Sequence, residues 1–394
     1  MLESTKRPRI VSGMRPTGKL HLGNYMGALR NWVRLQNDGE HDCFFFIVDL
    51  HALTTDYADP SQLQQNTLDV AVDWLAAGLD PKRSTIFVQS DVQAHSELFT
   101  LLSMITPLGW LERVPSYKDQ QENLSSKDLT TYGFLGYPLL QAADILLYSE
   151  PGVPLRVPVG ADQVAHVEPT REVARRFNWL YTSGTKGIGY ATEQLVQLSK
   201  QLGARINSDT LVGAPFPENA KPPIFSEPEQ LLTPSPKLPG TDGRKMSKSY
   251  GNTIALDEPE ADIRAKLKTM VTDPARTKRS DPGNPEICPV GDLHKVFSSQ
   301  ETVRKVWEGC QTAGIGCIEC KGWLADAVIA ELAPMRETRE RYRANNYALI
   351  EPVLADGAAR ANEIATKTLQ IAQQAMGLKP ASHQVSESAS KERQ

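Results

Sequence analysis

A continuous apolar run from Cys43 to Val48 is the feature that most constrains the fold of this chain. Runs of this length are typical of a parallel strand that is buried on both faces. Two more strand-length segments follow, Ser84 to Gln89 and Leu155 to Val159, and a helical pattern such as His95 to Ile105 lies between them. This alternation predicts an α/β fold, with a doubly wound parallel sheet that binds a ligand where its strands end.

The chain of 394 residues is long enough for more than one domain. We expect a Rossmann-like catalytic domain over residues 1–206, followed over 207–262 by an insert and a loop that returns to that domain. Eight prolines between 207 and 240 predict a mostly irregular surface segment. Helical patterns over 263–379 predict a C-terminal α-helical domain, and the polar tail 380–394 is expected to be disordered.

Composition and charge exclude several classes of protein. No stretch is apolar over about 18 residues and the polar start of the chain lacks a signal-peptide core, so we expect a cytoplasmic protein without a membrane span. The formal net charge is −4, so no DNA partner is expected and any RNA contact must come from local basic patches. Two arginine groups are candidates, although such runs are more often solvated faces: Arg171, Arg175 and Arg176, and Arg336, Arg339, Arg341 and Arg343.

A first motif, Ser12 to Tyr25, lies between the first expected strand and the first expected helix. Its glycines let a ligand approach the backbone, and the start of the helix offers free N–H groups to phosphate. His21 and Asn24 can donate hydrogen bonds at the same place, and Arg15 can meet phosphate. The alternative is an ordinary strand–helix turn with a structural histidine, and the motif alone does not decide between the two.

A second motif, Lys245-Met246-Ser247-Lys248-Ser249, places two lysines three residues apart among serines. A mobile cationic loop of this kind suits a pyrophosphate leaving group, whose charge grows in the transition state. The alternative is a solvated basic loop, which is what most charge clusters are.

Together and in this order, the two motifs resemble the signature pair of class I aminoacyl-tRNA synthetases. The resemblance implies catalytic roles for His21, Asn24, Lys245 and Lys248, with Mg²⁺ expected beside the pyrophosphate and no dedicated protein ligands evident for it. It also implies that these motifs form most of the ATP site, with Leu238 as a contact on the adenine side. The residues concerned are Arg15, Pro16, Thr17, Gly23, Asn24, Leu238, Lys245, Met246, Ser247, Lys248 and Ser249.

A third motif, Gly160-Ala161-Asp162-Gln163, follows an expected strand and resembles the Gly-x-Asp-Gln segment of the tryptophan and tyrosine branch of this class. The resemblance implies that Gly160, Ala161 and Asp162 hold the ribose side of ATP and that Gln163 reaches the ammonium of the amino acid. On its own, Asp162 could be an ordinary helix N-cap, opening a helix expected from Asp162 to Phe177.

The choice between tryptophan and tyrosine depends on the side-chain pocket. An indole carries one polar group, an N–H donor, which a buried site must meet with one acceptor. Asp144 lies among apolar residues and resembles the acceptor of tryptophanyl-tRNA synthetases, in a segment that also supplies Tyr137 and Gln141. Tyrosyl enzymes usually have a tyrosine near the start of the first motif, where this chain has the apolar Val11.

The resemblance to tryptophanyl-tRNA synthetases extends over nearly the whole chain, and implies ATP, L-tryptophan and tRNA(Trp) as substrates and a homodimer as the assembly. Two residues depart from many bacterial members, which have Gln where Arg15 stands and Met where Gln141 stands. A tyrosyl-tRNA synthetase and a nucleotide- or RNA-binding paralogue without aminoacylation remain as alternatives. A dehydrogenase is disfavoured because no Gly-x-Gly-x-x-Gly follows the first strand.

Four cysteines in the last third of the chain have the spacing of a metal site. Four thiolates can hold Zn²⁺ or an iron–sulfur cluster. The spacing of Cys288, Cys310, Cys317 and Cys320 resembles a [4Fe–4S] motif found in some tryptophanyl enzymes, so a cluster is preferred to zinc. The alternative is four buried or incidental thiols.

Overall fold

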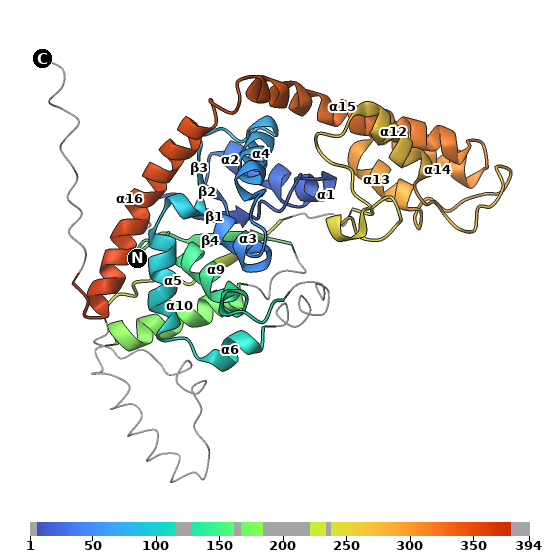
Figure 1. Ribbon diagram of the computed structural model, residues 1–394. Coiled ribbons are helices and arrows are strands. Elements are labelled where there is room, and N and C mark those ends of the chain that lie inside the picture. Colours follow the sequence, from blue (N-terminus) through green and yellow to red (C-terminus); the bar gives the residue numbers. More distant parts are fainter. Residues whose placement is uncertain (1–5, 115–127, 161–166, 184–220, 234–237, 380–394) are drawn as a thin grey trace, which may run out of the picture.

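The computed structural model describes residues 6–114, 128–160, 167–183, 221–233 and 238–379 (Figure 1). Five parallel strands form one sheet in the order β3-β2-β1-β4-β5. Helices flank this sheet, which confirms the predicted doubly wound α/β fold with a helical C-terminal part. The strands are β1 (Arg9–Met14), β2 (Asp42–Ile47), β3 (Ser84–Val88), β4 (Leu155–Val159) and β5 (Glu229–Leu232).

The order of the strands reverses at β1, which pairs with β2 on one side and with β4 on the other. In an open parallel sheet, the loops that leave such a point diverge to opposite faces and leave a crevice for a ligand. The first motif begins in β1, and Gly160, the first residue of the third motif, follows β4, so the topology brings both to this crevice.

The phenylalanines of β2 show why the strand is buried on both faces. Phe45 lies in the core on one face, where it stacks on Trp32 with ring centroids 4.8 Å apart. Phe44 and Phe46 point to the opposite face, where Phe46 stacks on Phe87 of β3 at 5.1 Å. Each buried aromatic ring contributes roughly 1.5–3 kcal/mol relative to exposure.

Helices of the catalytic part cover the two faces of the sheet. On the face of Phe45 lie α2 (Arg30–Asp38) and α4 (Leu63–Ala76), and on the face of Phe46 lie α5 (Ala94–Ser103) and α9 (Tyr137–Leu146). The other helices of this part are α3 (Asp49–Asp56), α6 (Leu108–Glu112), α8 (Tyr132–Leu135) and α10 (Glu168–Thr182).

The helix of the first motif is not regular. It begins as α1 (Leu22–Asn24), passes through a π-helical turn at Tyr25–Leu29 and continues as α2. Local π-helical turns occur preferentially at functional sites, because the extra residue re-aims the side chains on one side of the helix.

The C-terminal part is helical, as the sequence predicts. It contains α12 (Glu260–Thr269), α13 (Pro289–Phe297), α14 (Gln300–Gln311), α15 (Cys317–Ala344) and α16 (Glu351–Ala375). In Figure 1, α12 to α14 lie along one half of α15, away from the sheet, and α16 runs back along the catalytic part. There α16 packs against β3 and α5. A Cβ at Gly357 would lie 1.8 Å from the carbonyl oxygen of Ile86, so only glycine permits this close approach.

Two details differ from the sequence-based expectations. The proline-rich segment contains β5, which pairs with β4 and extends the sheet. Sequence reasoning missed it because Glu229–Leu232 is short and not strongly apolar. The helix expected from Asp162 begins at Glu168 among the described residues. None of the described helices is long and apolar enough to cross a membrane.

Candidate active site

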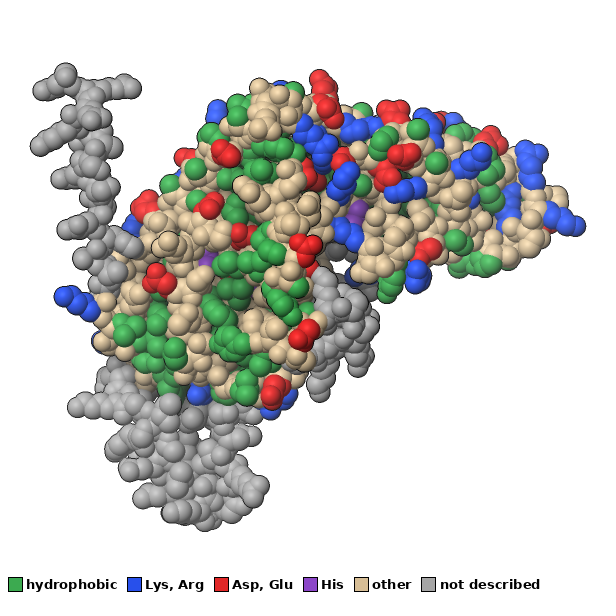
Figure 2. Space-filling view, in the orientation of Figure 1, with side chains coloured by type: hydrophobic (Ala, Val, Ile, Leu, Met, Phe, Trp, Pro, Cys, Tyr) green, Lys and Arg blue, Asp and Glu red, His purple; other side chains and the backbone are tan. Residues whose placement is uncertain are grey.

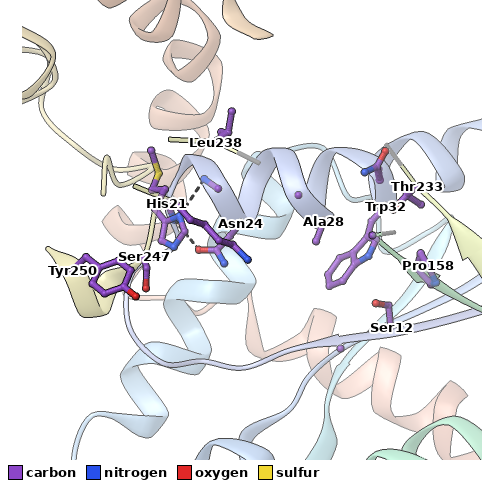
Figure 3. Close-up of a pocket in the computed structure, with 17 residues that line it drawn as sticks. Ser12, His21, Asn24, Ala28, Trp32, Pro158, Thr233, Leu238, Ser247 and Tyr250 are labelled. Carbon is purple, nitrogen blue, oxygen red and sulfur yellow. Dashed lines mark hydrogen bonds between the residues drawn. The ribbon is translucent and has the colours of Figure 1, made fainter. Parts of the chain in front are cut away.

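A cavity of about 560 Å³ lies at the reversal point of the sheet, beside the helix of the first motif. One end is polar and receives residues of the two signature motifs, while the other is formed by strand ends, the segment after β5 and the side of α2 (Figure 3). His21, Asn24, Ser247 and Tyr250 surround the first end, and Ser12, Trp32, Pro158 and Thr233 the second.

His21 and Asn24 cap the first helix by a reciprocal pair of hydrogen bonds. The Nδ1 of His21 accepts from the N–H of Gly23 at 3.1 Å, and the Oδ1 of Asn24 accepts from the N–H of His21 at 3.1 Å. A Cβ at Gly23 would lie 2.9 Å from the His21 ring, so glycine allows the cap to close. Burial, and then Lys248, lower the pKa of His21 to about 4.

The protonation state of His21 follows from this cap. At neutral pH the imidazole is uncharged, and because Nδ1 accepts a hydrogen bond, Nε2 carries the proton. Since Oδ1 of Asn24 is held by the backbone, its amide nitrogen is the part left to donate to a ligand. The capped turn therefore presents two neutral donors to the polar end of the cavity.

The second motif is held in place by Asn252, a buried residue just beyond it. Its Oδ1 accepts from the N–H of Ser247 at 2.8 Å, and its Nδ2 donates to Asp242 at 2.7 Å and to the carbonyl of Lys245 at 3.2 Å. Met246 is buried and its N–H donates to the carbonyl of Leu238 at 2.9 Å. These bonds order the loop while leaving the side chain of Lys245 exposed at the cavity.

Lys248 joins the two motifs directly. Its Nζ donates to the carbonyls of Thr17 and Gly18, at 3.0 and 2.9 Å, although these residues are about 230 positions away in the chain. Burial of the ammonium, and then the neighbouring Arg15, lower the pKa of Lys248 to about 8. The positive charge that Lys248 and Arg15 bring together favours an anionic ligand.

A second cavity, of about 480 Å³, lies on the other side of this contact. The guanidinium of Arg15 faces it and donates to the hydroxyl of Thr55 in α3. The residues that the sequence assigned to ATP divide between the two cavities. Gly23, Asn24, Gly160, Leu238, Lys245, Met246 and Ser247 line the first cavity, and Arg15, Pro16, Thr17, Lys248 and Ser249 line the second. Ala161, Asp162 and Gln163 lie outside the described residues.

Asp144 is buried in α9, as its apolar neighbours predicted, and three side chains bind it. Oδ1 accepts from Gln89 at 2.7 Å and from His95 at 2.6 Å, and Oδ2 accepts from His51 at 2.9 Å. Burial would raise the pKa of Asp144, but His95 and His51 outweigh it and lower that pKa below its usual range. The carboxylate is therefore ionised, and it keeps acceptor capacity on Oδ2.

Of the other residues expected at the amino acid, Tyr137 and Gln141 share α9 with Asp144, and neither they nor Val11 line either of these cavities. Tyr137 and Gln141 are half-buried on α9, and the ring of Tyr137 packs edge-on against His51 with centroids 4.3 Å apart. Val11 is fully buried in β1, in the core on the face of Phe46. It is an apolar side chain without contact to solvent.

Sequence reasoning missed the three partners of Asp144. His51 follows β2, and Gln89 and His95 follow β3, so all lie beyond the carboxyl ends of buried strands. Polar residues at such positions are candidates for a site in this fold, and that signal could have found them. Their common partner could not be read from the sequence, because the three bonds span 93, 55 and 49 residues.

The four cysteines approach one another at the ends of three helices, α13, α14 and α15. Cys288 precedes α13, Cys310 ends α14, and Cys317 and Cys320 lie in the first turn of α15. Burial, and then the other three thiols, raise the pKa of Cys320 to about 12. In the part of the chain that the structure describes, no three His, Cys, Asp or Glu side chains are arranged to hold a metal ion.

The arginines considered for RNA are mostly engaged within the protein. Arg175 pairs with Glu172 and Glu227, at 2.6 and 2.8 Å. Arg339 is only 3% exposed and pairs with Asp73, which attaches α15 to α4. A guanidinium buried to this extent is not available to a phosphate.

The fold and the meeting of the two motifs define the class: the chain is a class I aminoacyl-tRNA synthetase. Residues 3–333 match the family described as tRNA synthetases class I (W and Y). The chain belongs to the bacterial-type tryptophanyl-tRNA synthetases within that family.

The similarity to individual proteins extends over almost the full length. The tryptophan–tRNA ligase of Ralstonia nicotianae is 48% identical, covering 94% of this chain and 98% of that protein. The tryptophan–tRNA ligase of Thermotoga maritima is 47% identical, covering 94% and 99%. A crystal structure of the Campylobacter jejuni tryptophanyl-tRNA synthetase with ADP and tryptophan superimposes with a TM-score of 0.73, at 31% identity over 94% of this chain and all of that one.

Proposed function

We propose that this protein, in the cytoplasm, activates L-tryptophan with ATP and transfers it to tRNA(Trp). The observation that carries the proposal is the contact of Lys248 with the carbonyls of Thr17 and Gly18, which joins the two signature motifs, whose residues line two cavities. Adenylate formation needs donors and positive charge around a triphosphate, and the contact between the two motifs supports such a role for them.

In the first step, the carboxylate oxygen of tryptophan attacks the α-phosphorus of ATP. A C–O–P linkage forms, the bond from the α-phosphorus to the bridging oxygen breaks, and pyrophosphate leaves with the electron pair. Since no proton is transferred, the protein needs no nucleophile or base. Its contribution is alignment of the two reactants and stabilisation of negative charge.

His21 and Asn24 are proposed to donate to the phosphate oxygens, through the imidazole Nε2–H and the side-chain amide. Neutral donors held by a cap need little reorganisation as charge develops. Lys245 and Lys248, with Arg15, are proposed to stabilise the leaving pyrophosphate, and Mg²⁺ bound with ATP would neutralise further charge. In the second step, a hydroxyl of the terminal adenosine of the tRNA attacks the adenylate carbonyl and AMP leaves.

Recognition of tryptophan is proposed to depend on Asp144, with Val11, Tyr137 and Gln141 around the ring and Gln163 at the ammonium. An ionised, buried carboxylate is a strong acceptor for the single N–H of an indole. The apolar Val11 offers no partner to a phenol hydroxyl, which favours tryptophan over tyrosine.

Charging of a tRNA(Trp) transcript with labelled tryptophan tests this proposal. We expect ATP-dependent acid-precipitable label on tRNA(Trp) and none on a tRNA(Tyr) transcript. Formation of adenylate without charging would favour the alternative of a synthetase-like paralogue. Charging of tRNA(Tyr) with tyrosine would favour the tyrosyl enzyme.

We also propose that Cys288, Cys310, Cys317 and Cys320 hold a [4Fe–4S] cluster, with Zn²⁺ as the alternative. Cys288 lies at the N-terminus of α13, and Cys317 and Cys320 at that of α15, where the positive end of a helix dipole stabilises a thiolate. Cys310 ends α14, and the Nη1 of Arg276 lies 3.7 Å from its Sγ. Because burial raises the pKa of Cys310 and of Cys320, these two thiols are protonated without metal, and binding must release their protons.

Iron and sulfide analysis after anaerobic purification tests this second proposal. A brown protein with about four irons per chain, lost in the Cys320→Ser variant, is expected. A colourless protein with stoichiometric zinc favours the alternative metal. A preparation with neither metal would contradict both and leave four structural thiols.

A homodimer is proposed for the assembly. Apolar side chains are unusually exposed around the end of α5 and the starts of α6 and α8: Met104 is 70%, Leu108 58% and Tyr132 61% exposed. Figure 2 shows hydrophobic side chains gathered over the region where Figure 1 places α5, α9 and α10.

Light scattering of the unmodified protein should give twice the chain mass. A double variant that carries Met104→Glu and Leu108→Glu should give the mass of the monomer. A monomeric unmodified protein would contradict the proposal.

A further inference from the structure

A chain of polar side chains runs inward from Asp144, the residue proposed to meet the indole. The Nδ1 of His95 binds Oδ1 of Asp144 at 2.6 Å, and the Nε2 of His95 binds the hydroxyl of Tyr148 at 2.9 Å. On the other side, the Nε2 of His51 binds Oδ2 at 2.9 Å. We refer to Tyr148, His95, Asp144 and His51 as the buried relay.

The buried relay is almost completely shielded from solvent. Tyr148 and His95 are 0% exposed, His51 2% and Asp144 3%. Aromatic rings surround its inner end, where Phe46 lies 5.5 Å from the ring of His95. With so little access to water, the partners within the protein determine where each proton lies.

The proton positions follow from the neighbours of Asp144. An ionised carboxylate only accepts, so His95 donates from Nδ1 and His51 donates from Nε2. In an uncharged imidazole with its proton on Nδ1, the Nε2 of His95 accepts from the hydroxyl of Tyr148. Gln89 is oriented in the same sense, because its Oε1 accepts from the N–H of Leu50 at 3.2 Å and its Nε2 therefore faces Asp144.

All of these donors point towards Asp144. The end of the buried relay formed by Asp144 and His51 therefore offers acceptors. Oδ2 of Asp144 retains a lone pair, and the Nδ1 of His51 is buried without a hydrogen-bond partner among the described residues. The ring of His51 packs against Tyr137, a residue proposed to contact tryptophan. A buried, unmet acceptor on this side is complementary to a donor on a ligand.

We propose that His95 and Tyr148 are positioning residues for tryptophan, which hold Asp144 as an ionised, oriented acceptor so that the site selects ligands carrying an indole N–H. Neither residue contacts the substrate. Without the donor of His95, Oδ1 loses a charge-assisted hydrogen bond, and the buried carboxyl can rotate or take up a proton. A protonated carboxyl presents an O–H and no longer selects a donor. This inference rests on the proposed function.

The inference predicts an effect on selectivity rather than on activity alone. A ligand that lacks the N–H leaves a buried acceptor unpaired, which a site built around that acceptor rejects. The matching ligand pair is L-tryptophan and 3-(benzothiophen-3-yl)-L-alanine, in which sulfur replaces the indole N–H. The ratio of their kcat/KM values in ATP–pyrophosphate exchange measures how strongly the N–H is selected.

Three variants test the relay. His95→Leu should reduce the ratio about tenfold, the usual effect of losing a hydrogen bond to a charged group, with the KM for ATP unchanged. His95→Asn, whose amide can donate near the place of Nδ1, should restore most of that loss. Tyr148→Phe removes one hydroxyl from the core and should reduce the ratio about threefold. Tyr181→Phe is the control, since that ring packs on Phe177 outside the relay.

An unchanged ratio in both His95→Leu and Tyr148→Phe, with equal losses for the two amino acids, would show a purely structural role and overturn the inference. A ratio in His95→Asn no higher than in His95→Leu would also overturn it. If the unmodified protein exchanged with neither amino acid, the proposed function itself would fail, and that result is distinct from an unchanged ratio.

Discussion

The position of Lys248 leads to a prediction about the pH dependence of ATP use. Its ammonium binds two backbone carbonyls and lies beside Arg15, and its pKa is lowered to about 8. The charged form, which we propose stabilises the pyrophosphate, is therefore lost as the pH rises through 8. About nine tenths of the lysine is charged at pH 7 and about one tenth at pH 9, whereas an ordinary lysine stays charged at both.

We therefore expect kcat/KM for ATP to fall about tenfold between pH 7 and pH 9 at saturating tryptophan. This parameter reports ionisations of the free enzyme, before bound ATP can raise the lysine pKa. The assay is ATP–pyrophosphate exchange at constant ionic strength. Lys248→Arg keeps its charge throughout this range, so its profile should be flat at a lower absolute rate, while Lys245→Arg should keep the fall.

Two outcomes would refute this reasoning. A flat profile of the unmodified protein up to pH 9 would mean that the pKa of Lys248 is not lowered to about 8. A tenfold fall that persists in Lys248→Arg would assign the titration to a different group.

Two further predictions concern stability in urea. Arg339→Met leaves the buried Asp73 unpaired and should lower the free energy of unfolding by about 3–5 kcal/mol. Adding Asp73→Leu removes the unpaired charge and should recover at least half of this loss. Equal stability of the single and double variants would contradict a stabilising ion pair. Gly291→Ala would place a Cβ 2.2 Å from the carbonyl oxygen of Pro285 and should destabilise by about 1–3 kcal/mol. By contrast, a Cβ at Gly322 inside α15 would meet open space, so Gly322→Ala should stabilise the protein by up to about 1 kcal/mol. A Gly322→Ala variant less stable than the Gly291→Ala variant would contradict this packing.

Several strands of the sheet could be predicted because each is a short, mostly apolar stretch of the sequence. The apolar run Cys43 to Val48 became β2, and Leu155 to Val159 became β4 with unchanged bounds. In contrast, β5 lies in a proline-rich segment and is recognisable only by its pairing with β4. The strand order also depends on which edges meet in three dimensions, which no local pattern specifies.

The sequence predicted the motifs of the candidate site but not the hydrogen bonds that join them. The two motifs were recognisable as short residue patterns, and their order in the chain indicated one class of enzyme. The bond from Lys248 to the first motif crosses about 230 residues, and the three partners of Asp144 come from other elements, so neither could be derived from spacing. Arg339 was a candidate for RNA contact because it lies in a run of arginines. In the structure it is buried and pairs with Asp73 and Asp257, which come from distant segments of the chain.

The central claim is that this site activates tryptophan, and amino-acid-dependent ATP–pyrophosphate exchange tests it most directly. With tryptophan and tyrosine compared at matched concentrations, we expect a kcat/KM for tryptophan about a hundredfold or more above that for tyrosine. Exchange that is equal for the two amino acids, or faster with tyrosine, would contradict it.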